Sequence, residues 1–205
     1  MFLVVCRMQQ ELKTEGTRNL ITATAFLQFY KNGFKATSVN EIMKAAGLSK
    51  GAFYHNFKNK DDLGVLVVKA ELNTRIYEAM ISPLYAEGQA KPILKNTFLN
   101  KLKAFTSDEK LMGCPVNNLI NEIGGSPNLL NEALKGLIDT WVKAVIQIIE
   151  RGHKDGSIKP ETNPQQAAIY LVSSFEGMRG IRKLYQDDIN WNAYSAALEN
   201  YIAQL

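Results

Sequence analysis

The residues with the clearest chemical potential lie between Thr37 and Lys60, in the stretch TSVNEIMKAAGLSKGAFYHNFKNK. Hydroxyl, lysine, histidine and asparagine side chains crowd here, and such groups donate hydrogen bonds to nucleic-acid phosphates. Lys50 can also donate to guanine O6 and N7, and Ala52 can contact a thymine methyl group. The expected DNA contacts are Thr37, Ser38, Ser49, Lys50, Gly51, Ala52, Tyr54, His55, Asn56, Lys58 and Lys60.

Gly51 supports the same interpretation. A glycine inside an ordinary helix costs up to about 1 kcal/mol relative to alanine. A close approach of the helix backbone to a ligand gives it a better reason. A helical hairpin with a solvated lysine face remains the alternative.

Two short helices must position these residues. Ser38 and Glu41 have the spacing of a capping box, and Gly47 can end the first helix. Ser49 then caps a second helix expected from Lys50 to His55. The predicted inward side chains are Ile42, Ala45, Ala46, Phe53 and Phe57. Two such helices joined by a tight turn are typical of a helix-turn-helix, whose second helix enters the major groove.

A helix predicted from Arg18 to Lys31, ended by Asn32 and Gly33, precedes this motif. Together they resemble the N-terminal domain of the TetR family of regulators. The matching residues are Ile21, Ala25, Phe29, Gly33, Phe34, Thr37–Val39, Ile42, Ala46–Gly51, Phe53–His55, Phe57–Lys60 and Leu63. The resemblance implies operator DNA as partner, an all-α fold, and dimerisation through the last two long helices.

The charge distribution agrees with a polyanionic partner. Residues 1–70 contain ten Lys or Arg and five Asp or Glu, a net charge of +5, whereas residues 71–205 carry a net charge of −1. All the excess positive charge therefore accompanies the helix-turn-helix, which favours double-stranded DNA as its partner.

The remaining chain shows helical periodicity and no alternating strand pattern. We expect an all-α protein of about nine helices, with a DNA-binding domain over 1–60 and an effector-binding and dimerisation domain over 61–205. Residues 1–10 are expected to be a disordered tail, or Met1 is expected to lie upstream of a true start at Met8. The expected later helices cover 61–81, as one straight rod, then 92–105, 116–123, a long helix opened by Ser126 and Pro127, 165–185, and 191–204 capped by Asn190. Residues 107–113 are expected to be a polar break.

An all-α domain of this size can enclose a small-molecule pocket. The expected lining is Tyr77, Phe98, Leu102, Phe105, Met112, Cys114, Leu119, Trp141, Phe175 and Met178. For each of these residues the alternative is an ordinary core role. Arg179 and Arg182 could neutralise an acidic ligand, but we expect both to be exposed.

The last two helices carry small residues and an apolar stripe, which suit close packing against a second copy. The expected dimer residues are Ala168, Ser173, Gly177, Gly180, Trp191, Tyr194, Leu198 and Tyr201. Periodicity alone leaves open whether this stripe is a dimer face or internal core.

Cys114 follows Gly113 at the start of a helix, where amide dipoles could lower a thiol pKa. This junction resembles a subset of TetR-type regulators, some of which sense electrophiles or oxidants through a cysteine. Two cysteines in all, with none nearby to resolve a sulfenic acid, leave a buried apolar role as the alternative.

Other classes of function fit poorly. The sequence has no zinc-type cysteine spacing, catalytic triad or phosphate-binding loop, so we expect no cofactor, no metal and no enzyme. The apolar opening MFLVVC is too short for a membrane span or a signal peptide, and a cytoplasmic location is expected. The leading hypothesis is a homodimeric repressor released from its operator by a small molecule. A thiol-based sensor and an α-helical protein-binding adaptor are the alternatives.

Overall fold

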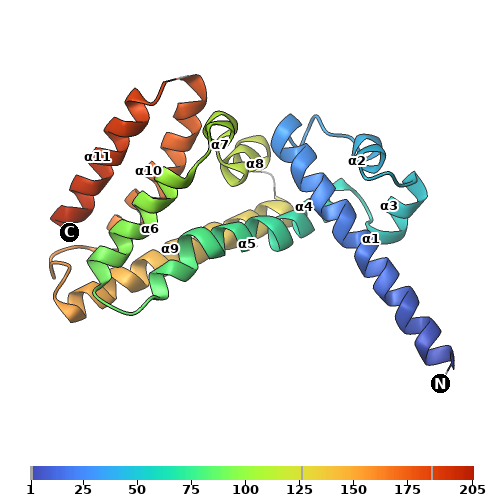
Figure 1. Ribbon diagram of the computed structural model, residues 1–205, viewed down its shortest axis with the longest axis horizontal. Coiled ribbons are helices and arrows are strands. Elements are labelled where there is room, and N and C mark those ends of the chain that lie inside the picture. Colours follow the sequence, from blue (N-terminus) through green and yellow to red (C-terminus); the bar gives the residue numbers. More distant parts are fainter. Residues whose placement is uncertain (1, 126, 186) are drawn as a thin grey trace. The chain divides into compact units, whose positions relative to one another are not determined.

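The computed structural model describes the backbone of residues 2–125, 127–185 and 187–205, and it describes side chains from residue 14 onward. All regular structure in this described part is helical, which confirms the all-α prediction (Figure 1). The chain forms two compact units. One comprises Met1–Leu72 with Leu119–Ala133, and the other comprises Asn73–Asn118 with Leu134–Leu205.

The first unit is built on three helices, α1 (Phe2–Asn32), α2 (Val39–Ala45) and α3 (Lys50–Asn56), followed by α4 (Lys60–Val67). Helix α1 includes residues 2–10, the stretch that we expected to be a disordered tail. The small core contains Ile21, Ala25, Phe29, Phe34, Ile42, Met43, Phe53, Phe57, Leu63 and Val67. Met43 takes the inward position that we assigned to Ala45, which is exposed.

The expected straight rod is interrupted twice. After α4 come a π-helical segment η1 (Val68–Leu72), α5 (Asn73–Ile76), a second π-helical segment η2 (Tyr77–Ile81) and a 3-10 turn η3 (Ser82–Tyr85). Buried residues recur here at every fourth position, namely Val68, Leu72, Ile76, Met80 and Leu84. An α-helix has about 3.6 residues per turn, so residues four positions apart would drift around its axis and would not stay on one face. The wider π turns keep these buried residues on one side.

The second unit contains α6 (Ala90–Ala104), α7 (Ser107–Met112), α10 (Pro164–Ile181), a short 3-10 turn η4 (Arg182–Leu184) and α11 (Ile189–Gln204). Helix α6 packs against α11 and against the η2–η3 segment (Figure 1). Two further helices belong to both units: α8 (Pro115–Ile123) passes from the second into the first, and α9 (Leu129–Asp155) returns.

Several expected boundaries change. The supposed polar break at 107–113 is helix α7, capped by a Thr106–Glu109 capping box that the sequence contains but we did not recognise. Helix α6 begins two residues before Pro92. Helix α9 begins at Leu129, after the expected opening at Pro127, and Ser126 lies outside the described residues. The residue before α11 is Asp188, and not Asn190, because α11 already begins at Ile189.

The candidate nucleic-acid interface and effector region

The helix-turn-helix has the local geometry that its sequence predicts. The Ser38 hydroxyl accepts a hydrogen bond from the Glu41 amide, and the Glu41 carboxylate accepts one from the Ser38 amide. Gly47 adopts a φ of 67°, the left-handed conformation that ends α2. The Ser49 hydroxyl accepts from the Ala52 amide and caps α3. These contacts cap both helices and end α2 at the turn.

The outer face of α3 presents free donors. Lys50, Tyr54 and His55 are exposed, as is Lys58 immediately after the helix, while Phe53 faces the core on the opposite side. Tyr54 leaves 58% of its surface accessible although its ring packs edge-on against Phe53. An aromatic hydroxyl, an imidazole and two ammonium groups on one surface are suited to contacts with phosphates and base edges.

Gly51 lies on this exposed surface. A Cβ atom added to it would meet only Ser49 Oγ, at 3.7 Å, which is ordinary van der Waals contact. Its φ is also not positive. The packing of the unit therefore has no need for glycine at this position, whereas close approach of another molecule to the backbone would require it.

Lys60 is placed differently from our expectation of a phosphate contact. Its ammonium group donates to the carbonyl oxygens of Phe34, Lys35 and Thr37, at 2.8, 3.3 and 3.0 Å. It also lies 4.6 Å from the centroid of the Phe34 ring. Three acceptors occupy all three of its donors, so Lys60 holds the turn after α1.

Two other expected contacts also have internal roles. Thr37 is buried, and its hydroxyl lies within hydrogen-bond distance of the Gly33 and Gln28 carbonyls. The Asn56 side chain donates to the Ala52 carbonyl, and the Asn56 carbonyl accepts from Arg18. We expected DNA contacts because these residues are polar. In the structure they instead form hydrogen bonds with backbone groups of the same unit.

Glu122 is a structural residue that the sequence analysis missed. Its carboxylate accepts hydrogen bonds from the backbone amides of Phe34, at 2.9 Å, and Lys35, at 2.7 Å. The turn at Phe34 and Lys35 is thus held from two sides. The Glu122 carboxylate accepts hydrogen bonds from its amides, and the Lys60 ammonium donates hydrogen bonds to its carbonyls. Residues so distant in the chain carry no sequence signal of their pairing.

Four of the ten expected effector-pocket residues form one aromatic core in the second unit. Phe175 packs against Phe98, Phe105 and Trp141, with ring centroids 5.5 to 6.2 Å apart. Phe105 also packs edge-on against Trp191. Leu102 and Met178 are buried, while Met112 is partly exposed. Two expected members lie elsewhere: Tyr77 is 53% exposed, and Leu119 belongs to the first unit.

Cys114 is buried within this core rather than activated. Burial, followed by the charge of Glu176, raises the pKa of its thiol, although Arg179 acts in the opposite direction. The expected lowering by a helix start is outweighed because the side chain is only 1% exposed. A thiol that stays protonated is a poor nucleophile, so this arrangement does not favour the thiol-sensor alternative.

Glu176 and Arg179 are buried beside Cys114. Arg179 donates to the Gly113 carbonyl at 3.0 Å and lies 4.3 Å from the centroid of the Phe105 ring. One of its nitrogens is 3.7 Å from Glu176, beyond hydrogen-bond distance, and both Glu176 oxygens are buried without a hydrogen-bond partner. Burial raises the pKa of the Glu176 carboxyl more than Arg179 lowers it.

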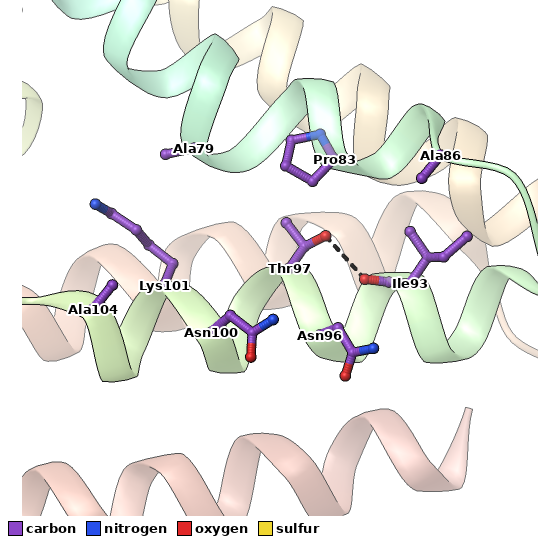
Figure 2. Close-up of a pocket in the computed structure, with 9 residues that line it drawn as sticks. All are labelled: Ala79, Pro83, Ala86, Ile93, Asn96, Thr97, Asn100, Lys101 and Ala104. Carbon is purple, nitrogen blue, oxygen red and sulfur yellow. Dashed lines mark hydrogen bonds between the residues drawn. The ribbon is translucent and has the colours of Figure 1, made fainter.

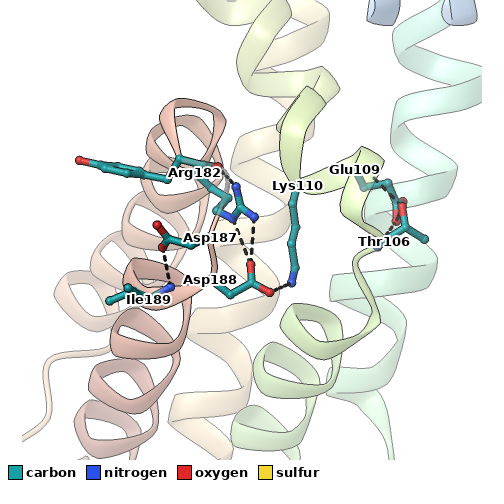
Figure 3. Close-up of polar contacts among 8 residues, drawn as sticks. Thr106, Glu109, Lys110, Arg182, Asp187, Asp188 and Ile189 are labelled. Carbon is teal, nitrogen blue, oxygen red and sulfur yellow. Dashed lines mark hydrogen bonds and ion pairs between the residues drawn. The ribbon is translucent and has the colours of Figure 1, made fainter.

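Arg182 is also buried, and our expectation of exposure is wrong for both arginines. Its guanidinium donates twice to one oxygen of Asp188 and also to the Tyr185 carbonyl, while Lys110 donates to the other Asp188 oxygen at 2.8 Å (Figure 3). Hydrogen bonds from Lys110 and then Arg182 lower the pKa of Asp188. This network ties α7 to the junction between α10 and α11.

The second unit also has a groove beside α6. It runs between α6 and the η2–η3 segment and has a volume of about 430 Å³ (Figure 2). Ala79, Pro83, Ala86, Ile93, Asn96, Thr97, Asn100, Lys101 and Ala104 line it. One wall of the groove includes Ala79 of the π-helical segment η2, which residue spacing did not reveal.

The expected dimer residues fall into two groups. Ala168, Trp191 and Leu198 are buried in the core of their own chain. Ser173 and Gly177 are exposed, and Gly180, Tyr194 and Tyr201 are partly exposed. The exposed side of α10 also carries Ile169, Tyr170 and Ile181, which are about half accessible.

Within the described residues, no helix is long and apolar enough to cross a membrane. The described part likewise contains no group of three or more His, Cys, Asp or Glu side chains that could hold a metal ion. Neither finding adds a ligand type to those considered above.

Two family models match the chain. Residues 21–64 match the model of bacterial regulatory proteins of the tetR family, and residues 92–198 match a tetracyclin repressor-like C-terminal domain. The first match covers the helix-turn-helix, and the second covers slightly more than half of the chain, including most of α6, all of α7 to α10 and most of α11.

Curated relatives and solved structures agree. The transcriptional regulator AcuR of Cereibacter sphaeroides is 26% identical over 149 residues, which cover 72% of this chain and 67% of AcuR. The transcriptional repressor DhaR of Mycobacterium sp. strain GP1 is 25% identical and is covered to 73%, as is this chain. A TetR-family regulator from Cytophaga hutchinsonii has the same fold, with a TM-score of 0.83 at 22% identity over 94% of this chain and 96% of that one.

Proposed function

This chain belongs to the TetR family of DNA-binding transcriptional regulators, and from that premise we propose that it is a homodimeric repressor released from its operator by a small molecule. The observation that carries the proposal is the exposed outer face of α3. It combines free donors with a glycine that the packing of the unit does not require.

On this proposal α3 enters the major groove of operator DNA. Lys50 reaches a guanine edge, the backbone at Gly51 lies close to the duplex, and Tyr54, His55 and Lys58 contact the phosphates. Ser38 and Ser49 flank the same surface at the helix starts. Thr37, Asn56 and Lys60 act indirectly, by holding the turn and the end of α3.

A second copy is needed because helix-turn-helix dimers read two half-sites about 34 Å apart or a multiple of that distance. The exposed side of α10 offers a suitable face. Ile169, Ser173, Gly177 and Ile181 follow one another at four-residue spacing, and all four are exposed. Small residues at the centre allow close helix packing, and the apolar residues at both ends supply burial on association.

The effector acts, on this proposal, by binding one conformation of the dimer more tightly than the other. Helices α8 and α9 and the helical run from α4 to η3 each contain residues of both units. A change in any of these helices within the second unit is therefore covalently connected to the DNA-binding unit. Such a regulator would work in the cytoplasm, where operator DNA is accessible.

Selection of bound fragments from the source genome, followed by footprinting, tests the proposal directly. We expect one protected region with two inverted half-sites, and a gel shift that resists competitor DNA. A single-chain species at micromolar concentration, or a shift abolished equally by any competitor, would contradict it.

A further inference from the structure

We propose that the groove between α6 and the η2–η3 segment binds a small organic monoanion with an apolar tail, such as a medium-chain carboxylate. This inference rests on the proposed function, because it assigns the effector a place and a chemical class. It differs from the expectation that an effector would be lined by the aromatic cluster of Phe98, Phe105, Trp141 and Phe175.

The lining of the groove defines its ligand. Its walls are mostly apolar, formed by Ala79, Pro83, Ala86, Ile93 and Ala104. Asn96, Thr97 and Asn100 add uncharged polar groups, and Lys101 is the single charged residue among the nine that line it. Ligand sites of about 300 to 1,000 Å³ commonly combine an apolar wall with a few polar groups, and this groove falls within that range. A single positive charge favours a single negative charge on the ligand.

Lys101 is suited to bind that charge. Figure 2 shows its side chain reaching from α6 toward the side of Ala79. Its ammonium lies 4.5 Å from the centroid of the Phe105 ring, and it makes no ion pair among the described residues. Lys95 and Lys110, by contrast, pair with Glu199 and Asp188.

The surroundings of Lys101 leave its charge incompletely balanced. Burial lowers its pKa, and the nearby Arg179 and Arg75 lower it further, while Glu109 alone among the carboxylates acts in the opposite direction. Glu109 is itself engaged by the amide and hydroxyl of Thr106. A ligand carboxylate would supply the missing negative charge in a partly desolvated position, where a charged hydrogen bond is strong.

One wall of the groove belongs to the π-helical segment η2, through Ala79. Single π-helical turns within longer helices are frequent at functional sites. This wall is part of the helical run that begins at Lys60 in the first unit. A ligand that prefers one arrangement of the η2 turn would therefore shift the equilibrium of a helix shared by both units.

Calorimetric titration of the full-length protein with sodium octanoate tests the proposal, with sodium acetate and octan-1-ol as probes that lack the tail or the charge. We expect octanoate to bind about tenfold or more tightly than either. Lys101→Met should weaken octanoate binding about tenfold or more and leave octan-1-ol binding unchanged. The matched control is Lys103→Met, because Lys103 is exposed on the same helix and does not line the groove.

A second variant guards against a folding defect in Lys101→Met. Ala86 is exposed and lines the groove, so Ala86→Leu should block binding of octanoate without disturbing the core. The proposal is overturned if octanoate does not bind, or if neither Lys101→Met nor Ala86→Leu changes its dissociation constant. A gel shift with the ligand-free protein distinguishes failure of the proposed function from failure of the groove assignment. If the protein binds DNA specifically but does not bind octanoate, the proposed function stands and only the assignment of the groove as effector site is overturned.

Discussion

The carboxylate of Glu122 in α8 accepts a hydrogen bond from the backbone amide of Phe34, 88 residues earlier in the chain. A second hydrogen bond from Lys35 makes the contact bidentate. The turn that follows α1 is therefore held from outside the contiguous helix-turn-helix segment, and the DNA-binding unit is incomplete without the end of α8.

Glu122→Ala should destabilise the protein by roughly 1–3 kcal/mol, because two amides lose a charged acceptor. Urea unfolding of the full-length chain measures this change. Asn121→Ala is the matched control, since Asn121 is the exposed neighbour in the same helix. Equal stability of the two variants would mean that the Glu122 contact contributes nothing.

Gly51→Ala should separate folding from DNA binding. The added Cβ meets no obstacle within the chain, and alanine is the better helix former, so the midpoint of thermal unfolding should stay the same or rise. Operator affinity should fall about tenfold or more, because the methyl group lies where the backbone approaches DNA.

The control for Gly51→Ala is Gly136→Ala. Gly136 lies in α9, where an added Cβ would meet nothing within 4 Å. Both variants should fold, and only the change at position 51 should weaken the gel shift. Full operator affinity in Gly51→Ala would remove the main support for α3 as the reading helix.

Lys58 and Lys60 should differ in their effects. Lys58→Ala should weaken binding to all DNA sequences and reduce the slope of log affinity against log salt by about 0.9, as expected for the loss of one phosphate contact. Lys60→Ala should instead lower the free energy of unfolding, because three carbonyl groups lose their donor. Salt titration and urea unfolding of both variants check the contrast, and an unfolding curve for Lys60→Ala identical to wild type would refute it.

Glu176 should make the protein less stable as the pH rises. Burial raises its folded-state pKa above the ordinary value of 4.5, so the folded chain retains a proton that the unfolded chain has released. Stability therefore falls as pH increases from about the ordinary value toward the folded pKa. Glu176→Gln should remove this decline and be the more stable protein at neutral pH, whereas the exposed Glu132→Gln should retain it. Urea unfolding at a series of pH values gives the comparison, and parallel curves for wild type and Glu176→Gln would contradict the prediction.

Cys114 should react slowly with alkylating reagents in the folded protein. Its thiol is buried and its pKa is raised by that burial, so little thiolate is available. In a Cys6→Ser background, iodoacetamide labelling followed by mass spectrometry should be slow in buffer and fast in urea. Equal rates in the two conditions would restore the thiol-sensor alternative.

The local features were predictable where the information is local. The Ser38–Glu41 capping box, the left-handed Gly47 and the inward Phe53 and Phe57 each depend on residues a few positions apart. Long-range features were not predictable in this way. Whether Lys60 faces DNA or the carbonyls of the preceding turn depends on where α1 ends in space. Tyr77 is exposed at the start of a π-helical segment that residue spacing did not indicate.

The packing of the effector region also could not be predicted from residue type and spacing. We expected Phe98, Phe105, Trp141 and Phe175 to line an effector pocket, whereas their rings pack against one another. The groove beside Lys101 has mostly alanines and short polar side chains in its walls, which no pattern of large apolar residues would indicate.

The path of the chain, which leaves the DNA-binding unit at Leu72 and re-enters it from Leu119 to Ala133, restricts how the protein can be engineered. A hybrid regulator made by joining residues 1–72 to a foreign sensor domain would lack both Glu122 and Leu130, whose side chain packs beside Gly64. A hybrid regulator should therefore fold only when residues 119–133 are transferred together with residues 1–72.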